Sequence, residues 1–304
     1  MTRRRALLFL TATAAPALLR AQPAAHPVVL IVTADASDYL LAAGGTIAGM
    51  IERGATAYLI RVTNDEVDSY DLPPVETARR TGAESEQAAK ILGIKDVLPL
   101  GYRAANLGAV SFTEIRDRLV FCIRHYQPQI LFIPNPYAEY DRVLDRYFAG
   151  RAAEDAWRAV ALENFAPPQA EAGLQPHLTP EVYYYSQPLD PRRREPESTA
   201  TFVPEPKVVD ISTTFERKLR AVEALKTINS SMARRLKDRF TATHRRLPLL
   251  DTADEKSVNR LVEVNVRGLA KLCARGTSYS LAEEFRYAGV EFRIPSKYRS
   301  SLRR

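Results

Sequence analysis

The stretch from residue 27 to residue 54, PVVLIVTADASDYLLAAGGTIAGMIERG, decides the fold. Its first eight residues form a mostly apolar run, which is typical of a strand buried on both faces of a parallel sheet. Residues 38–54 then show the apolar spacing of a helix and end at Gly54, a favourable residue just beyond a helix. Asp35 and Asp38 stand where the strand gives way to the helix, a place where ligands bind in open parallel sheets. The stretch therefore predicts a strand–helix unit with two acids at its turn.

The same alternation of strand and helix continues along the first half of the chain. Apolar runs predict further strands at 56–64, 96–102 and 129–136, and helical spacing predicts helices at 76–94, 111–128 and about 144–162. Strands that alternate with helices at this spacing indicate βαβ units. We therefore expect a Rossmann-like α/β fold, with a parallel sheet sandwiched by helices.

The second half is expected to add a C-terminal helical extension to the same domain. Its pattern predicts strands at 181–186 and 207–212, a long helix at 215–240 and another helix at roughly 254–275. The predicted divisions are a signal peptide at 1–21, an α/β core at 26–190, a surface loop at 191–206, a C-terminal part of the same domain at 207–292 and a basic tail at 293–304.

The first 21 residues have the composition of an export signal. Arginines at positions 3–5 precede a short apolar run, and a cleavage site fits after Ala21. The apolar run is too short to span a bilayer, and the paired arginines are compatible with either the Tat or the Sec route. We expect an exported protein, periplasmic or extracellular, with no transmembrane segment in its mature chain.

The charge of the chain bears on its binding partners, and its cysteine content bears on disulfide formation. The formal net charge of the whole chain is +7, and four of the positive charges lie in the signal segment, so the rest carries +3. No basic stripe is interleaved with aromatic residues, which argues against a nucleic-acid partner. Cys122 and Cys273 lie in helix-like apolar patterns, so we expect two separate buried thiols rather than a disulfide.

Several segments, in order and spacing, resemble the LmbE-like, or PIG-L-type, zinc-dependent de-N-acetylases. They are LLAAGGTIAGMIERGATAYLIRVTNDE, RRTGAESEQAAKILGIKDVLPLGYR, IRHYQPQILFIPNPY, AGRAAEDA, YYYSQP, VVDISTTFERKLRAVEAL and YSLAEEFR. The resemblance covers most of the mature chain and implies a Rossmann-like fold, a zinc cofactor and hydrolysis of N-acetylglucosamine-type amides.

The first motif of this family, His-Pro-Asp-Asp-Glu, is altered here. Counting back from Gly44-Gly45-Thr46 places it on Asp35-Ala36-Ser37-Asp38-Tyr39. In the family the His and the second Asp bind zinc, and the first Asp is the general base. On this alignment Asp38 is retained, Asp35 replaces the ligand His, and Ser37 stands at the position of the base. A serine hydroxyl does not take up a proton near neutral pH as a carboxylate does.

The second motif, His-Pro-Asp-His, supplies another zinc ligand in the family. Alignment on residues 149–152 places it at residues 143–146, with Asp145 and Arg146, whereas a shift of four residues gives Asp141 and Arg142. Neither register contains a histidine, and an arginine is a permanent cation that cannot coordinate a metal.

The remaining histidines do not offer a substitute ligand set. His26, His125, His177 and His244 are the four histidines of the chain, and each lies in a loop or at an element end away from the motifs. A later family histidine falls on Ile228 by alignment. Catalytic zinc usually has three protein ligands dominated by histidine, so a zinc site is not expected.

Two arrangements of the remaining acids stay open. Asp35 and Asp38, with Asp145 or Asp141, could form an all-oxygen site suited to Ca²⁺, Mg²⁺ or Mn²⁺ rather than Zn²⁺. Alternatively, Arg146 takes the place of the metal and forms ion pairs with the acids. We favour the ion pair.

Other side chains are candidates for ligand binding. They are Arg79, Arg80, Tyr137, Tyr140 and Arg146, and the acids Asp65 and Glu66 follow the second strand. Arg79 or Arg80 aligns with a substrate-handling arginine of the family, but either could equally be an ordinary helix-face residue.

Three hypotheses about function follow. The first is an exported de-N-acetylase-like protein that has lost most of its zinc site, with weak or no activity and a retained cleft for a sugar or glycoconjugate. The second is an active amidohydrolase with an all-carboxylate, non-zinc metal site. The third is a structural or partner-binding protein of the cell envelope.

Overall fold

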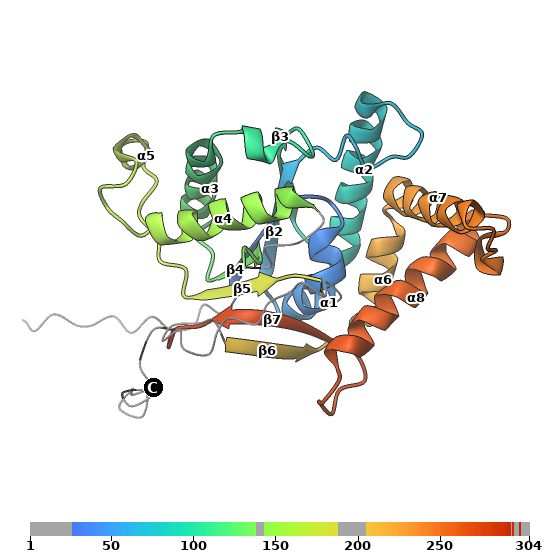
Figure 1. Ribbon diagram of the computed structural model, residues 1–304. Coiled ribbons are helices and arrows are strands. Elements are labelled where there is room, and N and C mark those ends of the chain that lie inside the picture. Colours follow the sequence, from blue (N-terminus) through green and yellow to red (C-terminus); the bar gives the residue numbers. More distant parts are fainter. Residues whose placement is uncertain (1–25, 138–142, 188–204, 293, 295–297, 299–304) are drawn as a thin grey trace, which may run out of the picture.

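The computed structural model describes residues 26–137, 143–187 and 205–292, together with residues 294 and 298. Figure 1 shows a central sheet with helices on both of its faces. The sheet has seven strands in the order β3-β2-β1-β4-β5-β7-β6. The strands are β1 (Val28–Thr33), β2 (Thr56–Thr63), β3 (Asp96–Tyr102), β4 (Ile130–Pro134), β5 (Glu181–Tyr185), β6 (Glu205–Asp210) and β7 (Ala282–Ala288). The expected α/β fold class is confirmed.

Some predictions concern residues outside the described part of the chain. These are the signal peptide, most of the surface loop at 191–206, most of the basic tail, and the candidates Tyr140, Asp141 and Arg142. No helix of the described residues is long and apolar enough to span a membrane.

The sheet is parallel over five strands and antiparallel at one edge. β1 pairs in parallel with β2 and β4, and β3 and β5 extend the parallel part on either side. β7 is antiparallel to both β5 and β6, so an antiparallel edge is added to the predicted parallel sheet. The apolar pattern does not predict β7, because Glu283 and Glu284 interrupt it, yet the Glu283 side chain is buried.

β1 is buried on both faces, as its sequence predicts. Val29 and Ile31 belong to the core packed under α1, α2, α6 and α8, whereas Leu30 and Val32 belong to the core under α3 and α4. The helices are α1 (Asp38–Glu52), α2 (Pro74–Leu92), α3 (Phe112–Tyr126), α4 (Leu144–Ala159), α5 (Pro167–Glu171), α6 (Phe215–Glu223), α7 (Lys226–Ala242) and α8 (Glu255–Cys273), with single 3₁₀ turns at Leu107–Ala109 and Pro248–Leu250. Cys122 and Cys273 are both buried and form no disulfide with each other, which agrees with the expectation of two separate buried thiols.

The predicted helix at 215–240 is in fact two helices, α6 and α7, so this prediction was wrong. A residue from a distant part of the chain caps the start of the second helix. Glu84 of α2 accepts hydrogen bonds from the backbone N–H and the hydroxyl of Thr227, at the start of α7. A carboxylate that caps the first turn stabilises a new helix start. The apolar spacing alone does not reveal this cap, because it comes from another helix.

The Gly-Gly-Thr segment lies inside α1 and explains why the helix packs so closely. A Cβ at position 45 would lie 2.8 Å from the Ile211 side chain, which follows β6. The backbone N–H groups of Gly45 and Thr46 donate to the Glu283 carboxylate at 2.9 and 2.8 Å. Glu283 also accepts from the Lys218 ammonium of α6, at 2.7 Å. This segment therefore joins α1, α6 and β7 into one unit.

The order of the strands predicts where a ligand site lies. From β1 the chain builds β2 and β3 on one side, and then returns to build β4 and β5 on the other side. In open parallel sheets the crevice for a ligand lies beyond the carboxyl ends of the strands at such a switch point. Residues 34–38, after β1, and residues 135–146, after β4, meet that condition.

Candidate active site

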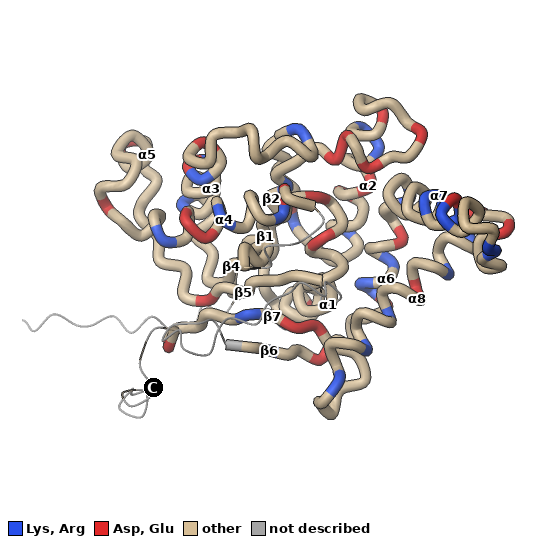
Figure 2. The backbone as a smooth tube through the Cα atoms, in the orientation of Figure 1, with Lys and Arg blue, Asp and Glu red and all other residues tan. Residues whose placement is uncertain are grey.

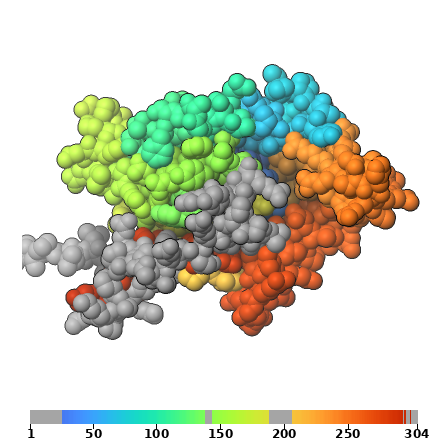
Figure 3. All heavy atoms as spheres, viewed as in Figure 1, coloured from blue at the N-terminus to red at the C-terminus, as the bar shows by residue number. Residues whose placement is uncertain are grey.

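A cavity of about 750 Å³ opens beyond the carboxyl ends of β1 and β2. Its floor includes Asp35, Ser37, Asp65, Asp68 and Arg146. Its walls come from residues 104–109, from Val143, Leu144 and Phe148, and from one face of α7. In the space-filling view the orange α7–α8 region forms one side of the molecule, and the green region of α3 to α5 forms the other (Figure 3). The cavity is the site that the strand order predicts.

Arg146 pairs with both acids of the first motif. It lies in the first turn of α4, and its Nε donates to Asp35 Oδ2 at 2.7 Å. Its Nη1 lies 3.4 Å from Asp38 Oδ1, and its side chain is 11% exposed. Burial alone would raise the pKa of Asp35, but the Arg146 guanidinium and the hydrogen bonds from Ser37 hold it below its ordinary value. The structure thus contains the ion pair that the sequence favoured.

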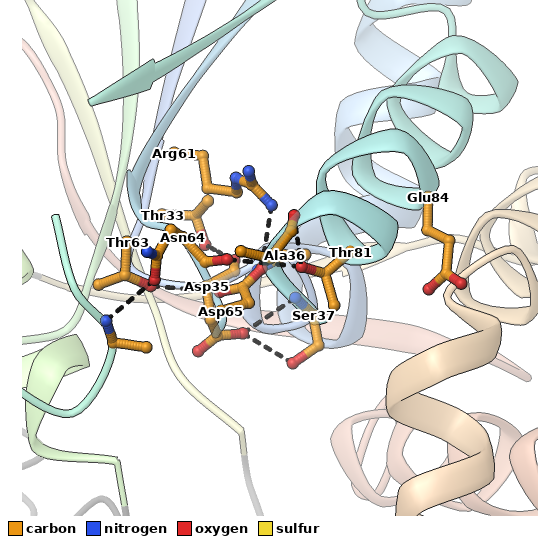
Figure 4. A network of polar contacts seen from close by, with 12 residues as sticks. Thr33, Asp35, Ala36, Ser37, Arg61, Thr63, Asn64, Asp65, Thr81 and Glu84 are labelled. Carbon is orange, nitrogen blue, oxygen red and sulfur yellow. Dashed lines mark hydrogen bonds and ion pairs between the residues drawn. The ribbon is translucent and has the colours of Figure 1, made fainter. Parts of the chain in front are cut away.

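Ser37, at the position of the family's general base, serves the start of α1 instead. The Asp35 Oδ1 atom accepts hydrogen bonds from the Ser37 hydroxyl at 2.7 Å and from the backbone N–H groups of Ser37 and Asp38. Figure 4 shows Ser37 turned toward Asp35 within this network. A serine hydroxyl is too weak a base to take up a proton from water near neutral pH, and here it donates to the Asp35 carboxylate instead.

Asp65 lines the cavity but is held by its neighbours. Its carboxylate accepts from Arg61 at 3.1 Å, from the Thr63 hydroxyl at 3.2 Å and from the backbone N–H of Ala36. Burial raises the pKa of Asp65, although the Arg61 guanidinium works in the opposite direction. This network ties the end of β2 to the turn after β1 (Figure 4). Glu66, the other acid of this loop, pairs instead with Arg103 at 2.7 Å.

Asp145 supports a loop rather than the acids of the first motif. Its two oxygens accept from the backbone N–H groups of Ala105, at 2.5 Å, and Leu107, at 3.1 Å. It therefore fixes the segment between β3 and the 3₁₀ turn. The sequence hypothesis of a metal site formed by Asp35, Asp38 and Asp145 has no support in this geometry.

The residues present do not fit a zinc ion. Among the described residues, no group of three or more His, Cys, Asp or Glu side chains is placed to hold a metal. A metal ion at Asp35 and Asp38 would also have to displace the Arg146 guanidinium, whose positive charge repels it. His26 contacts the Gly54 carbonyl and His177 the Pro128 carbonyl, near the amino ends of β2 and β4, whereas the cavity lies at the carboxyl ends of the strands.

The other candidates from the sequence lie outside the cavity. Arg79 and Arg80 both pair with Glu76 on the exposed face of α2, as ordinary surface residues of a helix do. Tyr137 donates its hydroxyl to Glu154 at 2.7 Å, in a cluster between α4 and β5. Of the candidates for ligand binding among the described residues, the structure places Arg146 in the cavity.

Sequence reasoning missed three charged residues of the cavity: Asp68, Arg235 and Arg239. Burial and the nearby Asp35 raise the pKa of Asp68 to about 6, although Arg146 and Arg235 oppose this shift. The two arginines belong to a stripe of α7 that lines the cavity, formed by Ile228, Ser231, Met232, Arg235, Leu236 and Arg239. Their spacing of three and four residues is the signal that could have shown a shared face.

Comparison with known proteins gives the context of this site. Residues 30–157 match the family described as PIG-L, GlcNAc-PI de-N-acetylase. A diacetylchitobiose deacetylase from Thermococcus kodakarensis is 28% identical over 197 residues, which cover 64% of this chain and 67% of the relative.

Solved structures show the same fold with more than one chemistry. The N,N′-diacetylchitobiose deacetylase of Pyrococcus horikoshii has a TM-score of 0.67 and 22% identity, with coverage of 91% of this chain and 89% of that chain. GalB, the 4-carboxy-2-hydroxymuconate hydratase of Pseudomonas putida, has a TM-score of 0.58 and 16% identity, with coverage of 89% and 98%. Since a hydratase has this fold as well, function has to be argued from the site.

Proposed function

Since the chain belongs to the LmbE-like, PIG-L-type deacetylase family, we propose that it is a member that binds a sugar or glycoconjugate without a metal and has little or no hydrolytic activity. The observation that carries this proposal is the position of Arg146. Its guanidinium contacts both Asp35 and Asp38, the two positions that align with zinc ligands of the family. A guanidinium has no vacant orbital to accept an oxygen lone pair, so it does not replace zinc as a Lewis acid.

Loss of hydrolysis follows from two replacements that act on different steps. The family reaction needs a metal that activates water and a base that takes the proton of that water. Arg146 occupies the space beside Asp35 and Asp38, and Ser37 replaces the base. Because neither half of the water activation remains, restoring one of them alone is not expected to restore catalysis.

Retention of ligand binding is supported by the cavity and by the relatives. A volume of about 750 Å³ lies within the usual range for small-molecule sites. The related Thermococcus kodakarensis protein is named as a diacetylchitobiose deacetylase, which suggests N-acetylated amino sugars as the ligand class. The signal-like first 21 residues support export, so the proposed ligand is one found outside the cytoplasm.

The first experiment tests binding and catalysis on the same sample. The purified mature protein is subjected to elemental analysis, and then titrated calorimetrically with N,N′-diacetylchitobiose in the presence of EDTA. We expect no stoichiometric metal, heat of binding that persists in the chelator, and no release of acetate. A metal at one equivalent together with acetate release would overturn the proposal and support the alternative of a metal-dependent amidohydrolase.

A second experiment restores the family motif. The triple variant Asp35→His, Ser37→Asp and Arg146→His provides two imidazoles, Asp38 and a base at the family positions. We expect it to bind about one equivalent of Zn²⁺. The matched control carries Asp35→His and Ser37→Asp but retains Arg146, and it should bind none. Zinc binding by the control would show that Arg146 does not exclude the metal.

A further inference from the structure

The charged groups of the cavity are divided between its floor and its α7 wall. The floor holds four acids, Asp35, Asp65, Asp68 and Asp145, together with Arg146. The wall contributed by α7 carries two arginines and no acid. In Figure 2 several Lys and Arg positions gather along α7. The two sides therefore present different chemistry to a ligand.

Three of the four floor acids are already engaged. Asp35 accepts from Arg146 and Ser37, and Asp65 accepts from Arg61. Asp145 uses both oxygens on backbone N–H groups. Asp68 is the remaining acid, and Arg235 acts electrostatically on it. The negative charge of three floor acids is thus compensated within the protein, whereas burial and the neighbouring acids disfavour the ionised form of Asp68.

The arginines of the α7 wall are not compensated in the same way. Among the ion pairs formed by the described residues, none includes Arg235 or Arg239. Arg234, on the neighbouring face of the same helix, pairs with Asp71 at 2.7 Å. Lys237 also has a partner, because its ammonium donates to the Asp251 carbonyl. Within the described part of the chain, the two arginines that line the cavity thus form no close ion pair, although Arg235 also acts electrostatically on Asp68, and both can bind an anionic group of a ligand.

The surroundings of these arginines suit a sugar with a charged substituent. Arg235 and Arg239 are four residues apart, so they lie one above the other on the helix, with Cβ atoms about 5–6 Å apart. Met232 and Leu236 lie beside them in the stripe, and Phe148 lines the opposite wall. Guanidinium groups bind carboxylate and sulfate oxygens through paired hydrogen bonds, and apolar side chains can cover the face of a sugar ring.

We propose that the ligand is an acidic sugar, whose carboxylate or sulfate group lies between Arg235 and Arg239 while its ring lies over the apolar part of the cavity. This inference rests on the proposed function, because it names the ligand class of the same cavity. It goes beyond that function, because neutral N-acetylated sugars require no such group. Arg235 and Arg239 then determine specificity rather than catalysis.

The experiment compares three probes on the mature full-length protein at low salt. They are N,N′-diacetylchitobiose, a hyaluronan tetrasaccharide that carries glucuronate carboxylates, and N-acetylglucosamine 6-sulfate. We expect an acidic probe to bind about tenfold more tightly than the neutral one, as charge-assisted hydrogen bonds provide. Comparison of the carboxylate probe with the sulfate probe shows which of the two acidic groups the cavity prefers. Binding of the preferred probe should weaken as the salt concentration rises.

Variants assign the effect to the two arginines. In Arg235→Gln with Arg239→Gln, the ratio of acidic to neutral affinity should fall to about one. Arg234→Gln removes a charge from the neighbouring face of the same helix and should leave that ratio unchanged. Circular dichroism and urea unfolding of each variant show that the fold is retained.

The outcomes separate this inference from the proposed function. Equal affinity for neutral and acidic probes would overturn the inference and leave the proposed function standing. A preference for acidic probes that survives the double variant would also overturn it, because the charge would then be read elsewhere. Failure of every sugar to bind would overturn the proposed function and the inference together.

Discussion

Two buried ion pairs hold α1, and they differ in what surrounds them. At the start of the helix, Arg146 contacts Asp35 and Asp38 beside an open cavity. At the middle of the helix, Lys218 pairs with Glu283 inside the core, with side chains only 1% and 3% exposed. The first pair stands where the family places a metal, and the second one fixes a segment that resembles the family closely. The comparison separates an ion pair that holds the fold together from an ion pair that belongs to the candidate site.

The inner pair is fully built into the backbone. Glu283 accepts from the backbone N–H groups of Gly45 and Thr46, and Lys218 also donates to the Leu41 carbonyl. Its two charges are matched, so removal of either one would leave an uncompensated charge in the core, which is strongly destabilising. The outer pair lies directly beside the cavity, so another cationic group could take the place of the Arg146 guanidinium without disturbing the core. The proposed function places the loss of hydrolysis at one end of α1, while the contacts at the middle of the helix keep the scaffold.

The largest expected effect comes from breaking the inner pair. Glu283→Gln keeps the shape but leaves the Lys218 ammonium buried without a counter-charge, so we expect the free energy of unfolding to fall by about 3–5 kcal/mol. Urea unfolding at pH 7 measures this change. The double variant Glu283→Gln with Lys218→Met removes the stranded charge and should recover part of the loss. A smaller loss for Glu283→Gln than for Arg146→Gln would contradict the proposed difference between the two pairs.

A second prediction tests the close approach beside the inner pair. In Gly45→Ala the new Cβ would lie 2.8 Å from Ile211, so the helix or the Ile211 side chain must move. Overpacking of this kind costs about 1–3 kcal/mol. Gly268→Ala is the matched control in α8, because nothing lies within 4 Å of the added Cβ. Alanine is the better helix former there, so the control should stabilise the protein slightly. Equal effects of the two changes would show that contact with Ile211 is unimportant.

The residues in these two predictions also show which parts of the fold could be predicted from the sequence. The first half of the fold could be predicted from local signals. Its strands and helices show regular apolar spacing, and a glycine can mark the end of a helix, as Gly54 does. β7 and the α6–α7 break could not, because they depend on Glu283 and Glu84, whose partners lie 238 and 143 residues away. A local pattern contains no signal for a charged residue that is buried by a distant partner.

The candidate site shows the same division. The contact between Arg146 and Asp35 could be predicted, because both positions align with zinc ligands of the family and a guanidinium can pair with carboxylates in place of a metal. The role of Asp145 could not, because its partners are backbone N–H groups of Ala105 and Leu107, which every sequence offers. Asp68 and the α7 arginines were missed because an acid in a loop and arginines on a helix are usually solvated.

Breaking the outer pair should cost less and change the pH dependence of stability. In Arg146→Gln the Asp35 carboxylate loses its cation but keeps the hydrogen bonds from Ser37 and Asp38, so we expect a loss of about 1–2 kcal/mol at pH 7. In the native protein the lowered pKa of Asp35 means that its contribution is present above the ordinary aspartate pKa and is lost as the pH falls below it. Without Arg146, burial dominates and raises this pKa.

The sign of that change can be measured. With a raised pKa the folded variant binds more protons than the unfolded chain, so its stability should decrease as the pH rises from about 4 toward neutrality. Urea unfolding at pH 5 and pH 8, for the variant and the unaltered protein in parallel, isolates the effect of this residue. A constant difference between the two proteins across this range would mean that Arg146 does not control the ionisation of Asp35.

The smallest expected effect concerns Asp68, which faces the outer pair across the cavity. Its pKa is raised from 3.8 to about 6, by burial first and then by Asp35 and Asp145, against the opposing charges of Arg146 and Arg235. Between these two pH values the folded protein binds more protons than the unfolded chain, so the ionised carboxylate lowers stability increasingly as the pH rises through this window. Asp68→Asn should therefore stabilise the protein at pH 7 by about 1 kcal/mol, after allowance for solvent screening, and have almost no effect at pH 4. Loss of stability at pH 7 would instead mean that Arg146 and Arg235 hold the ionised carboxylate favourably. A gain at pH 7 would show that the cavity tolerates an unfavourable charge, as ligand sites do, whereas the charges of the buried Lys218–Glu283 pair are matched.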